Sequence, residues 1–87
     1  MDKIYLITGA AGHLGSAVCS LLKERGERVR GLAYYTDNTE FIEKLGVEIV
    51  RGDVTDKESL RPLFADAENA YLIHTAAVGD IHSRENE

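Results

Sequence analysis

Residues 8–15, Thr-Gly-Ala-Ala-Gly-His-Leu-Gly, constrain the fold of this chain more than any other segment. They follow a short apolar run and precede a stretch with helical spacing, so a strand must turn sharply into a helix here. Gly9 permits the tight turn, Gly12 lets a ligand approach the backbone without meeting a Cβ, and Gly15 lets helix and strand pack closely. Because the first N–H groups of a helix lack intrahelical acceptors, this segment predicts a turn that cradles a phosphate.

Length and composition limit the alternatives. A chain of 87 residues forms one domain at most, with a modest core. A net charge of −5 argues against nonspecific binding to nucleic acid or to an anionic membrane. Cys19 is the one cysteine, which excludes an internal disulfide, and the sequence holds no apolar run long enough to span a membrane and no signal-peptide pattern. We therefore expect a cytoplasmic protein with neither nucleic acid nor membrane as partner.

The first helix is expected from an apolar stripe. Leu14, Val18, Leu21 and Leu22 recur at the spacing of one helix face, and Gly26 is placed to end the helix. Four short apolar segments are expected to form strands: residues 3–8, 28–33, 47–51 and 70–75.

Two further helices are expected between the later strands. Asp37 with Glu40 has the spacing of a capping box at the start of the second helix, and Thr55 with Glu58 has the same spacing at the start of the third. Pro62 should kink the third helix, because its ring removes one backbone hydrogen bond.

Alternation of four strands with three helices predicts an α/β fold with a parallel sheet and right-handed crossovers. With strand order 3-2-1-4 and helices on both faces, a ligand crevice opens at the carboxyl ends of the strands beside the glycine turn. We expect residues 1–78 to form this domain and residues 79–87 to be a flexible tail.

Three motifs in this order carry a family resemblance. They are Thr-Gly-x-x-Gly-x-x-Gly at residues 8–15, Gly-Asp-Val at residues 52–54 after the third strand, and His-Thr-Ala-Ala at residues 74–77 after the fourth. Together they resemble the extended short-chain dehydrogenase/reductases, which include NAD-dependent epimerases, dehydratases and dihydroflavonol-reductase-like enzymes. The resemblance implies a partial NAD(P)-binding Rossmann fold.

The resemblance also implies a set of cofactor-binding residues. Asp53 stands where the family's aspartate accepts a hydrogen bond from the adenine amino group, and the small residues after the fourth strand would lie against the cofactor. The expected cofactor-binding residues are Gly9, Gly12, His13, Leu14, Gly15, Ala33, Tyr34, Asp53, Val54, Thr75, Ala76 and Ala77.

The choice between NAD and NADP depends on the end of the second strand. An acidic residue there reads the ribose 2′-hydroxyl of NAD, and an arginine accommodates the 2′-phosphate of NADP. Ala33 and Tyr34 supply neither group. Since Ala33 does not repel a phosphate, the sequence favours NADP slightly.

The family resemblance predicts no catalytic residue within this chain. Family members catalyse with a Tyr-x-x-x-Lys pair and an upstream Ser or Thr, and none of the four tyrosines here has a lysine four residues later. We therefore expect the amino-terminal cofactor-binding portion of such an enzyme, without turnover of its own. His13, His74 and His82 lack metal-ligand spacing, so no metal site is expected.

Several alternatives stay open at this point. Asp53 could instead cap its own loop, His74 could be purely structural, and Tyr34 could be a surface aromatic residue. A nonenzymatic dinucleotide sensor of the nitrogen-regulator type shares the glycine turn and the Gly-Asp pair, and is the second candidate function. The outer edge of the fourth strand is expected to favour self-association.

Overall fold

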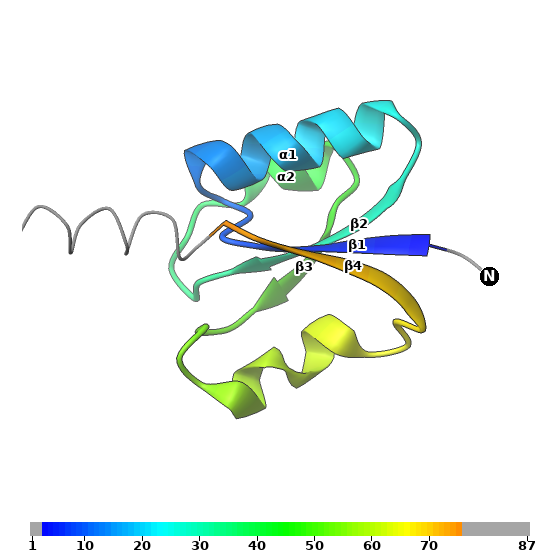
Figure 1. Cartoon of the computed structure of the whole chain (residues 1–87). Coiled ribbons are helices and arrows are strands. Elements are labelled where there is room, and N and C mark those ends of the chain that lie inside the picture. The colour runs from blue at the N-terminus through cyan, green and yellow to red at the C-terminus, as the bar shows by residue number, and fades with distance from the viewer. Residues whose placement is uncertain (1–2, 76–87) are drawn as a thin grey trace, which may run out of the picture.

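The computed structural model describes residues 3–75, whose elements alternate strand and helix as expected (Figure 1). In chain order they are β1 (Lys3–Thr8), α1 (His13–Glu24), β2 (Arg28–Ala33), α2 (Glu40–Lys44), β3 (Glu48–Arg51), η1 (Lys57–Phe64) and β4 (Asn69–His74). β3 begins one residue later than expected, and β4 lies one residue earlier. The expected flexible tail, residues 79–87, and the expected domain end at residue 78 lie outside the described residues.

The four strands form one parallel sheet in the order β3-β2-β1-β4, which confirms the expected topology. β1 lies between its two neighbours, so that Leu6 is opposite Arg30 of β2 and Leu72 of β4. All carboxyl ends therefore point to the same edge of the sheet, where a crevice forms between successive loops.

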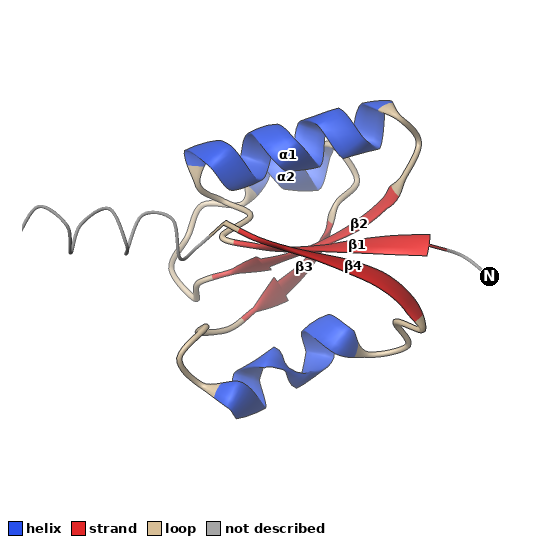
Figure 2. Cartoon of the chain, in the orientation of Figure 1, coloured by secondary structure: helices blue, strands red, loops and turns tan. Residues whose placement is uncertain are grey.

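Helices cover both faces of the sheet. α1 and α2 lie on one face and η1 lies on the other (Figure 2). Successive residues of β1 point to opposite faces, and each face has its own buried cluster. The cluster beneath α1 and α2 contains Ile7, Ala10, Cys19, Val29, Ile42 and Val47, and the cluster beneath η1 contains Ile4, Leu6, Leu32 and Leu63.

The buried face of α1 matches the expected apolar stripe in part, since Val18 and Leu22 pack against the core. Leu14 and Leu21 are each 52% exposed, whereas Gly15 and Cys19 are buried. A Cβ on Gly15 would lie 2.0 Å from the carbonyl oxygen of Gly9, so the helix contacts the glycine turn at this position. That contact turns Gly15 and Cys19 toward the sheet and leaves Leu14 and Leu21 outside. The end of the helix was correctly expected, since Gly26 follows it with a φ of 79°.

The expected capping box of α2 is wrong. The helix begins after Thr39, and the amide of Glu40 donates to Asn38 Oδ1 at 3.0 Å. The Asp37 carboxylate instead accepts from the amide of Tyr34 at 2.9 Å. A tight turn between Tyr34 and Asp37 draws this carboxylate away from the helix, so the spacing of residue types alone was misleading.

The third helix also differs from expectation. η1 is a 3₁₀ helix capped by Asp56, whose side chain accepts from the amide of Glu58, and Thr55 donates its hydroxyl to Asp53 instead. Pro62 lies inside the segment and supplies no N–H group. In a segment of only eight residues that contains a proline, few α-helical backbone hydrogen bonds can form. The segment therefore adopts a 3₁₀ helix rather than a kinked α-helix.

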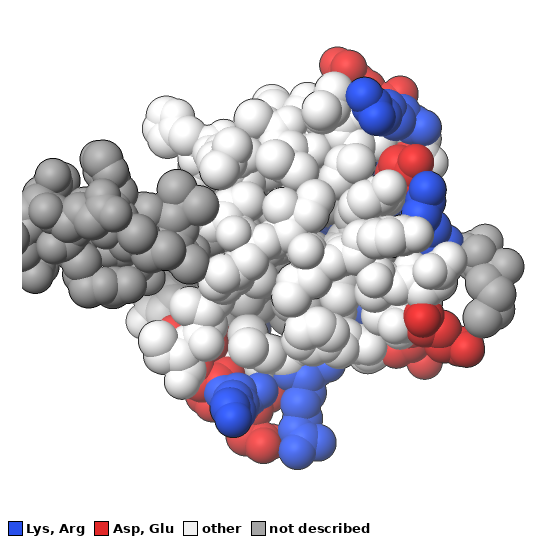
Figure 3. All heavy atoms as spheres, viewed as in Figure 1, with Lys and Arg blue, Asp and Glu red and all other residues white. Residues whose placement is uncertain are grey.

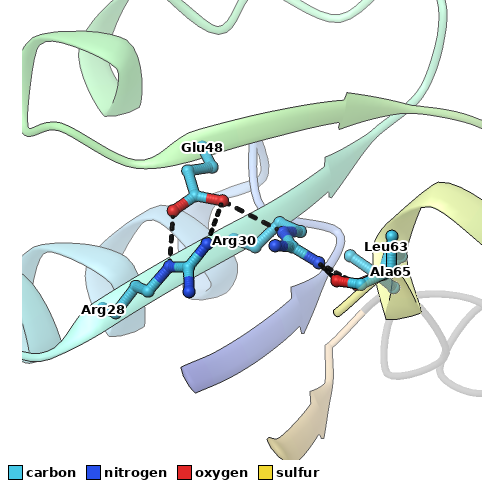
Figure 4. A network of polar contacts seen from close by, with 5 residues as sticks. All are labelled: Arg28, Arg30, Glu48, Leu63 and Ala65. Atoms are coloured by element: carbon cyan, nitrogen blue, oxygen red, sulfur yellow. Dashed lines mark hydrogen bonds and ion pairs between the residues drawn. The ribbon is translucent and has the colours of Figure 1, made fainter. Parts of the chain in front are cut away.

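Arg30 fastens η1 to the sheet (Figure 4). Arg30 is 7% exposed, and its Nη1 donates to the carbonyl oxygens of Leu63 at 2.9 Å and Ala65 at 2.6 Å. Its Nε donates to Glu48, which also accepts from Arg28 at 2.7 Å. The buried guanidinium therefore has acceptors for its charge and satisfies carbonyls at the end of η1.

β4 is an edge strand whose two faces are largely uncovered. Tyr71 and Leu72, on opposite faces, are 50% and 53% exposed. Tyr71 stacks on Tyr5 with 5.3 Å between ring centroids, and Lys3 lies 5.9 Å from the Tyr71 ring. In the view of Figure 3 the charged side chains lie around the rim, and the surface between them is uncharged.

Candidate functional site

The glycine turn and two following loops meet at the carboxyl ends of the strands. Two hollows border the turn, one of about 130 Å³ and one of about 250 Å³. The smaller hollow is lined by Gly9, Leu32, Tyr34, Asp37, Gly52, Asp53 and Val54. The larger is lined by Ala11, Gly12, His13, Ser16, Asn38, Phe41 and Ile42. An elongated ligand crossing the glycine turn would reach both hollows.

The glycines of the turn are not equivalent. Gly9 has a φ of 65°, which favours glycine, and the close contact with Gly9 described above excludes a side chain at Gly15. Gly12 has an ordinary φ of −77°, and a Cβ there would lie 3.4 Å from its nearest neighbour, the oxygen of Gly9. Neither backbone conformation nor packing within the described chain requires glycine at position 12.

The amino terminus of α1 opens beside Gly12. No side chain caps this end within the described residues, and the first turn holds no acidic residue. The amide of Gly12 donates to the oxygen of Gly9 at 3.0 Å, so this amide is already engaged within the turn. The amides of the exposed residues His13 and Leu14 follow at a helix end where N–H groups have no intrahelical acceptor.

The end of β4 braces the glycine turn. The amide of Thr75 donates to Thr8 Oγ1 at 3.1 Å, and the Thr75 hydroxyl donates to the carbonyl oxygens of Thr8 and Gly9. The hydroxyl of Thr8 also makes a 2.6 Å hydrogen bond with His74 Nδ1. Thr75 and His74 therefore position the turn from the neighbouring strand. Ala76 and Ala77 lie outside the described residues.

Asp53 holds its own loop and also lines the smaller hollow. Its Oδ1 accepts from the amide of Thr55 at 2.9 Å and from the hydroxyl of Thr55 at 2.8 Å. These hydrogen bonds lower the pKa of the Asp53 carboxyl, the amide contributing most. The amide of Asp53 donates to Ser59 Oγ at 2.9 Å, which ties the loop to η1. The carboxylate thus stays ionised at neutral pH, beside Val54 in the hollow wall.

The two residues at the end of β2 occupy different surroundings. Ala33 is 1% exposed, so its methyl group does not face the hollow. Tyr34 is 48% exposed and lines the hollow, with its ring edge-on to Tyr35 at 5.3 Å between centroids. Of the pair, Tyr34 is the residue that a ligand in the hollow would meet.

Sequence analysis missed one residue of this wall and a second residue that holds the loop carrying it. Asp37 was assigned to a helix cap, but it lines the smaller hollow. Arg51, at the end of β3, donates to the carbonyl oxygens of Tyr34 at 2.8 Å and Asp37 at 2.7 Å, and to Thr39 Oγ1 at 3.0 Å. Asp37 follows the last glycine of the turn by 22 residues, near the spacing of about 20 at which a ribose-binding acid is expected.

Residues 3–75 contain no group of three or more His, Cys, Asp and Glu side chains arranged to hold a metal ion. No helix in the same range has the length and apolarity needed to cross a membrane.

A family model and individual relatives both match this chain. The model of the NAD dependent epimerase/dehydratase family matches residues 5–87. UDP-glucuronate 4-epimerase 4 of Arabidopsis thaliana is 38% identical over 81 residues, covering 83% of this chain and 18% of its own length. Sterol demethylase protein B of Methylococcus capsulatus is 35% identical over 82 residues, covering 94% of this chain and 24% of its own length.

Solved structures agree with these relatives. The UDP-glucose 4-epimerase of Thermus thermophilus, crystallised in complex with NAD, superimposes with a TM-score of 0.72 and 34% identity. The match covers 84% of this chain and 24% of the epimerase. The chain therefore spans about a fifth to a quarter of the length of these relatives.

Proposed function

The chain belongs to the NAD dependent epimerase/dehydratase family, and we propose that residues 3–75 form its dinucleotide-binding portion. The observation that carries the proposal is Gly12. Its φ is ordinary and the protein leaves room for a Cβ, so the fold itself gives no reason for glycine at this exposed position. A pyrophosphate that must approach the backbone closely does give one.

The proposed placement divides the cofactor between the two hollows. The amides of His13 and Leu14 would hold the pyrophosphate beside Gly12, at a helix end where the macrodipole favours an anion. The smaller hollow would take the adenosine, and Asp53 Oδ2 would accept from the adenine amino group, because Oδ1 is engaged by Thr55. Gly9, Tyr34 and Val54 line the smaller hollow, Gly15, Ala33 and Thr75 support the turn and strand ends around it, and Ala76 and Ala77 stay proposed cofactor contacts.

The whole protein is proposed to be an oxidoreductase, epimerase or dehydratase. The nicotinamide ring, when bound, supplies hydride acceptance and donation. The chain offers no tyrosine with a lysine four residues later, so acid/base residues are not assigned here and the 87 residues alone should not turn over substrate. The relatives' substrates differ between a UDP-sugar and a sterol, and we propose none for this chain.

The nonenzymatic sensor remains the alternative function. It would use the same glycine turn and Gly-Asp pair, so dinucleotide binding alone does not separate the two. Family membership favours the enzyme. A Tyr-x-x-x-Lys pair encoded downstream of residue 87 would support the enzyme, and continuous coding sequence without that pair would support the sensor.

Two finer features complete the proposal. The single cysteine, Cys19, is buried and fits a cytoplasmic protein, which needs no disulfide. The glycine turn does not choose between NAD and NADP, because both dinucleotides carry the same pyrophosphate. Ala33, the reason for favouring NADP from sequence, is buried and does not decide the choice.

Self-association through β4 is the proposed protein contact. The outer edge of β4 has no neighbouring strand among the described residues, and Tyr71 and Leu72 extend apolar surface beside it. An unpaired edge next to apolar side chains favours pairing with another strand. A second copy of the chain, with the two β4 strands related by a twofold axis, is the proposed occupant.

Replacement of Gly12 by valine tests the proposed function. The side chain would occupy the path of the pyrophosphate, so affinity for NAD, or for NADP if that is the cofactor bound, should fall by a factor of about 100 or more. Isothermal titration calorimetry measures this, and circular dichroism checks the fold. Ala17→Val is the matched control, because Ala17 is an exposed residue of the same helix away from the turn. Equal affinity in wild type and Gly12→Val would refute the proposed placement.

A further inference from the structure

Among the described residues, two acidic residues and no basic residue line the smaller hollow. Asp37 and Asp53 are the acidic residues of its lining, and neither lysine nor arginine is among the residues that form it. Hydrogen bonds from Thr55 keep Asp53 ionised. A ligand group entering this hollow therefore meets negative charge from the loop after β2 and from the loop after β3.

The loop holds the Asp37 carboxylate in place. Oδ2 accepts from the amide of Tyr34 at 2.9 Å, and the amide of Asp37 donates back to the carbonyl oxygen of Tyr34 at 3.1 Å. Within residues 3–75, Oδ1 has no hydrogen-bond partner. One carboxylate oxygen thus fixes the side chain, and the other can accept a hydrogen bond from a ligand.

Arg51 fixes the same loop from the neighbouring strand. Its guanidinium donates to the carbonyl oxygens of Tyr34 and Asp37 and to the hydroxyl of Thr39. Those contacts direct its N–H groups at the loop between β2 and α2. Arg51 is not among the residues that line the smaller hollow. Arg51 is therefore a positioning residue for the loop, whereas a phosphate in the hollow would face Asp37.

We propose that Asp37 makes this site selective for NAD over NADP. The inference rests on the proposed function. Asp37 Oδ1 accepts a hydrogen bond from a ribose hydroxyl of NAD, which is the role of the acidic residue usually found at the end of the second strand. The 2′-phosphate of NADP would instead bring like charges together in a hollow whose described lining holds no basic residue. Asp37 thereby replaces the acid that Ala33 does not supply, and reverses the preference for NADP drawn from sequence.

Titration of the wild-type chain and of Asp37→Asn with NAD and with NADP tests the inference. The wild type should bind NAD at least roughly tenfold more tightly than NADP. Asp37→Asn keeps an oxygen for the amide of Tyr34, so the loop is retained, and the NAD preference should fall to about threefold or less, mainly through tighter NADP binding. Glu40→Gln is the matched control, because it removes the same charge from an exposed residue outside the hollow and should keep the wild-type preference.

A second measurement needs no variant. Repulsion of the 2′-phosphate is screened by salt, so the preference of the wild type for NAD should shrink as ionic strength rises from about 0.05 M to 0.5 M. Equal binding of the two dinucleotides by the wild type, or an unchanged preference in a folded Asp37→Asn variant, would overturn this inference alone. Binding of neither dinucleotide would overturn the proposed function and this inference with it.

Discussion

Glu48 joins two arginines of the neighbouring strand by ion pairs. Its carboxylate accepts from Arg28 Nε at 2.7 Å and from Arg30 Nε at 3.1 Å. The hydrogen bond from Arg28 is the main cause of a lowered pKa for the Glu48 carboxyl, and the bond from Arg30 adds to it against the opposing effect of partial burial. The charged form of Glu48 is therefore favoured in the folded chain relative to the unfolded chain.

This shift predicts a loss of stability in acid. A carboxyl whose pKa is lowered on folding contributes stability that is fully present above its unfolded pKa of about 4.3 and is lost as pH falls through the lower folded value. Glu48→Gln should therefore show a smaller loss of stability between pH 7 and pH 3 than the wild type. Urea denaturation at several pH values measures the difference.

Glu58→Gln is the control for this prediction. Glu58 pairs with Arg61, but their side chains are 76% and 77% exposed, so solvent screens the pair. The acid loss of stability in Glu58→Gln should follow that of the wild type. If the free energy of unfolding falls equally with pH in Glu48→Gln and in the wild type, the ion pairs of Glu48 do not contribute to the loss of stability in acid.

The roles of the glycines in the turn could be predicted from sequence, whereas the role of Asp37 could not. The glycine motif predicts the positions of Gly9 and Gly15, because the tight turn and the close helix contact are local consequences of chain geometry. Asp37 could not be placed, since its orientation depends on Arg51, which is 14 residues away and reaches the loop only after β2 and β3 pair. The spacing from the glycine turn was the one signal for Asp37 in the sequence.

At the scale of elements, η1 depends on one side chain. Leu63 is 1% exposed and packs with Ile4, Leu6 and Leu32, whereas its neighbour Phe64 is 48% exposed. Leu63→Ala should lower the free energy of unfolding by about 2–4 kcal/mol, because it removes buried carbons and leaves a cavity. Phe64→Ala should cost less than about 1.5 kcal/mol. Thermal or urea denaturation of the two variants measures both values, and a larger loss in Phe64→Ala would contradict this packing.

The elements themselves were easier to predict than their ends. Apolar periodicity places every strand within one residue, because burial in a parallel sheet needs continuous apolar runs. Helix starts were misjudged at α2 and η1, where several Asp, Asn and Thr side chains compete for the same amides. Asn38 and Asp56 supply the hydrogen bonds that spacing assigned to Asp37 and Thr55.

For the whole molecule, pairing through β4 predicts a dimer at micromolar concentration. Leu72→Lys should abolish it, because a charge beside an edge strand opposes strand pairing. Leu21→Lys is the matched control, since Leu21 on α1 is 52% exposed and Leu72 is 53% exposed. Sedimentation equilibrium distinguishes the species. A folded wild type that stays monomeric, or equal disruption by both variants, would contradict self-association through β4.

Binding of a dinucleotide at the glycine turn is the central claim, and a backbone amide NMR titration with NAD tests it most directly. In a chain of 87 residues each assigned amide reports its own surroundings. The largest shift changes should occur at His13 and Leu14, and in residues 34–37 and 52–54, with saturation as NAD is added. An unchanged spectrum at millimolar NAD, or changes confined to β4, would contradict the claim.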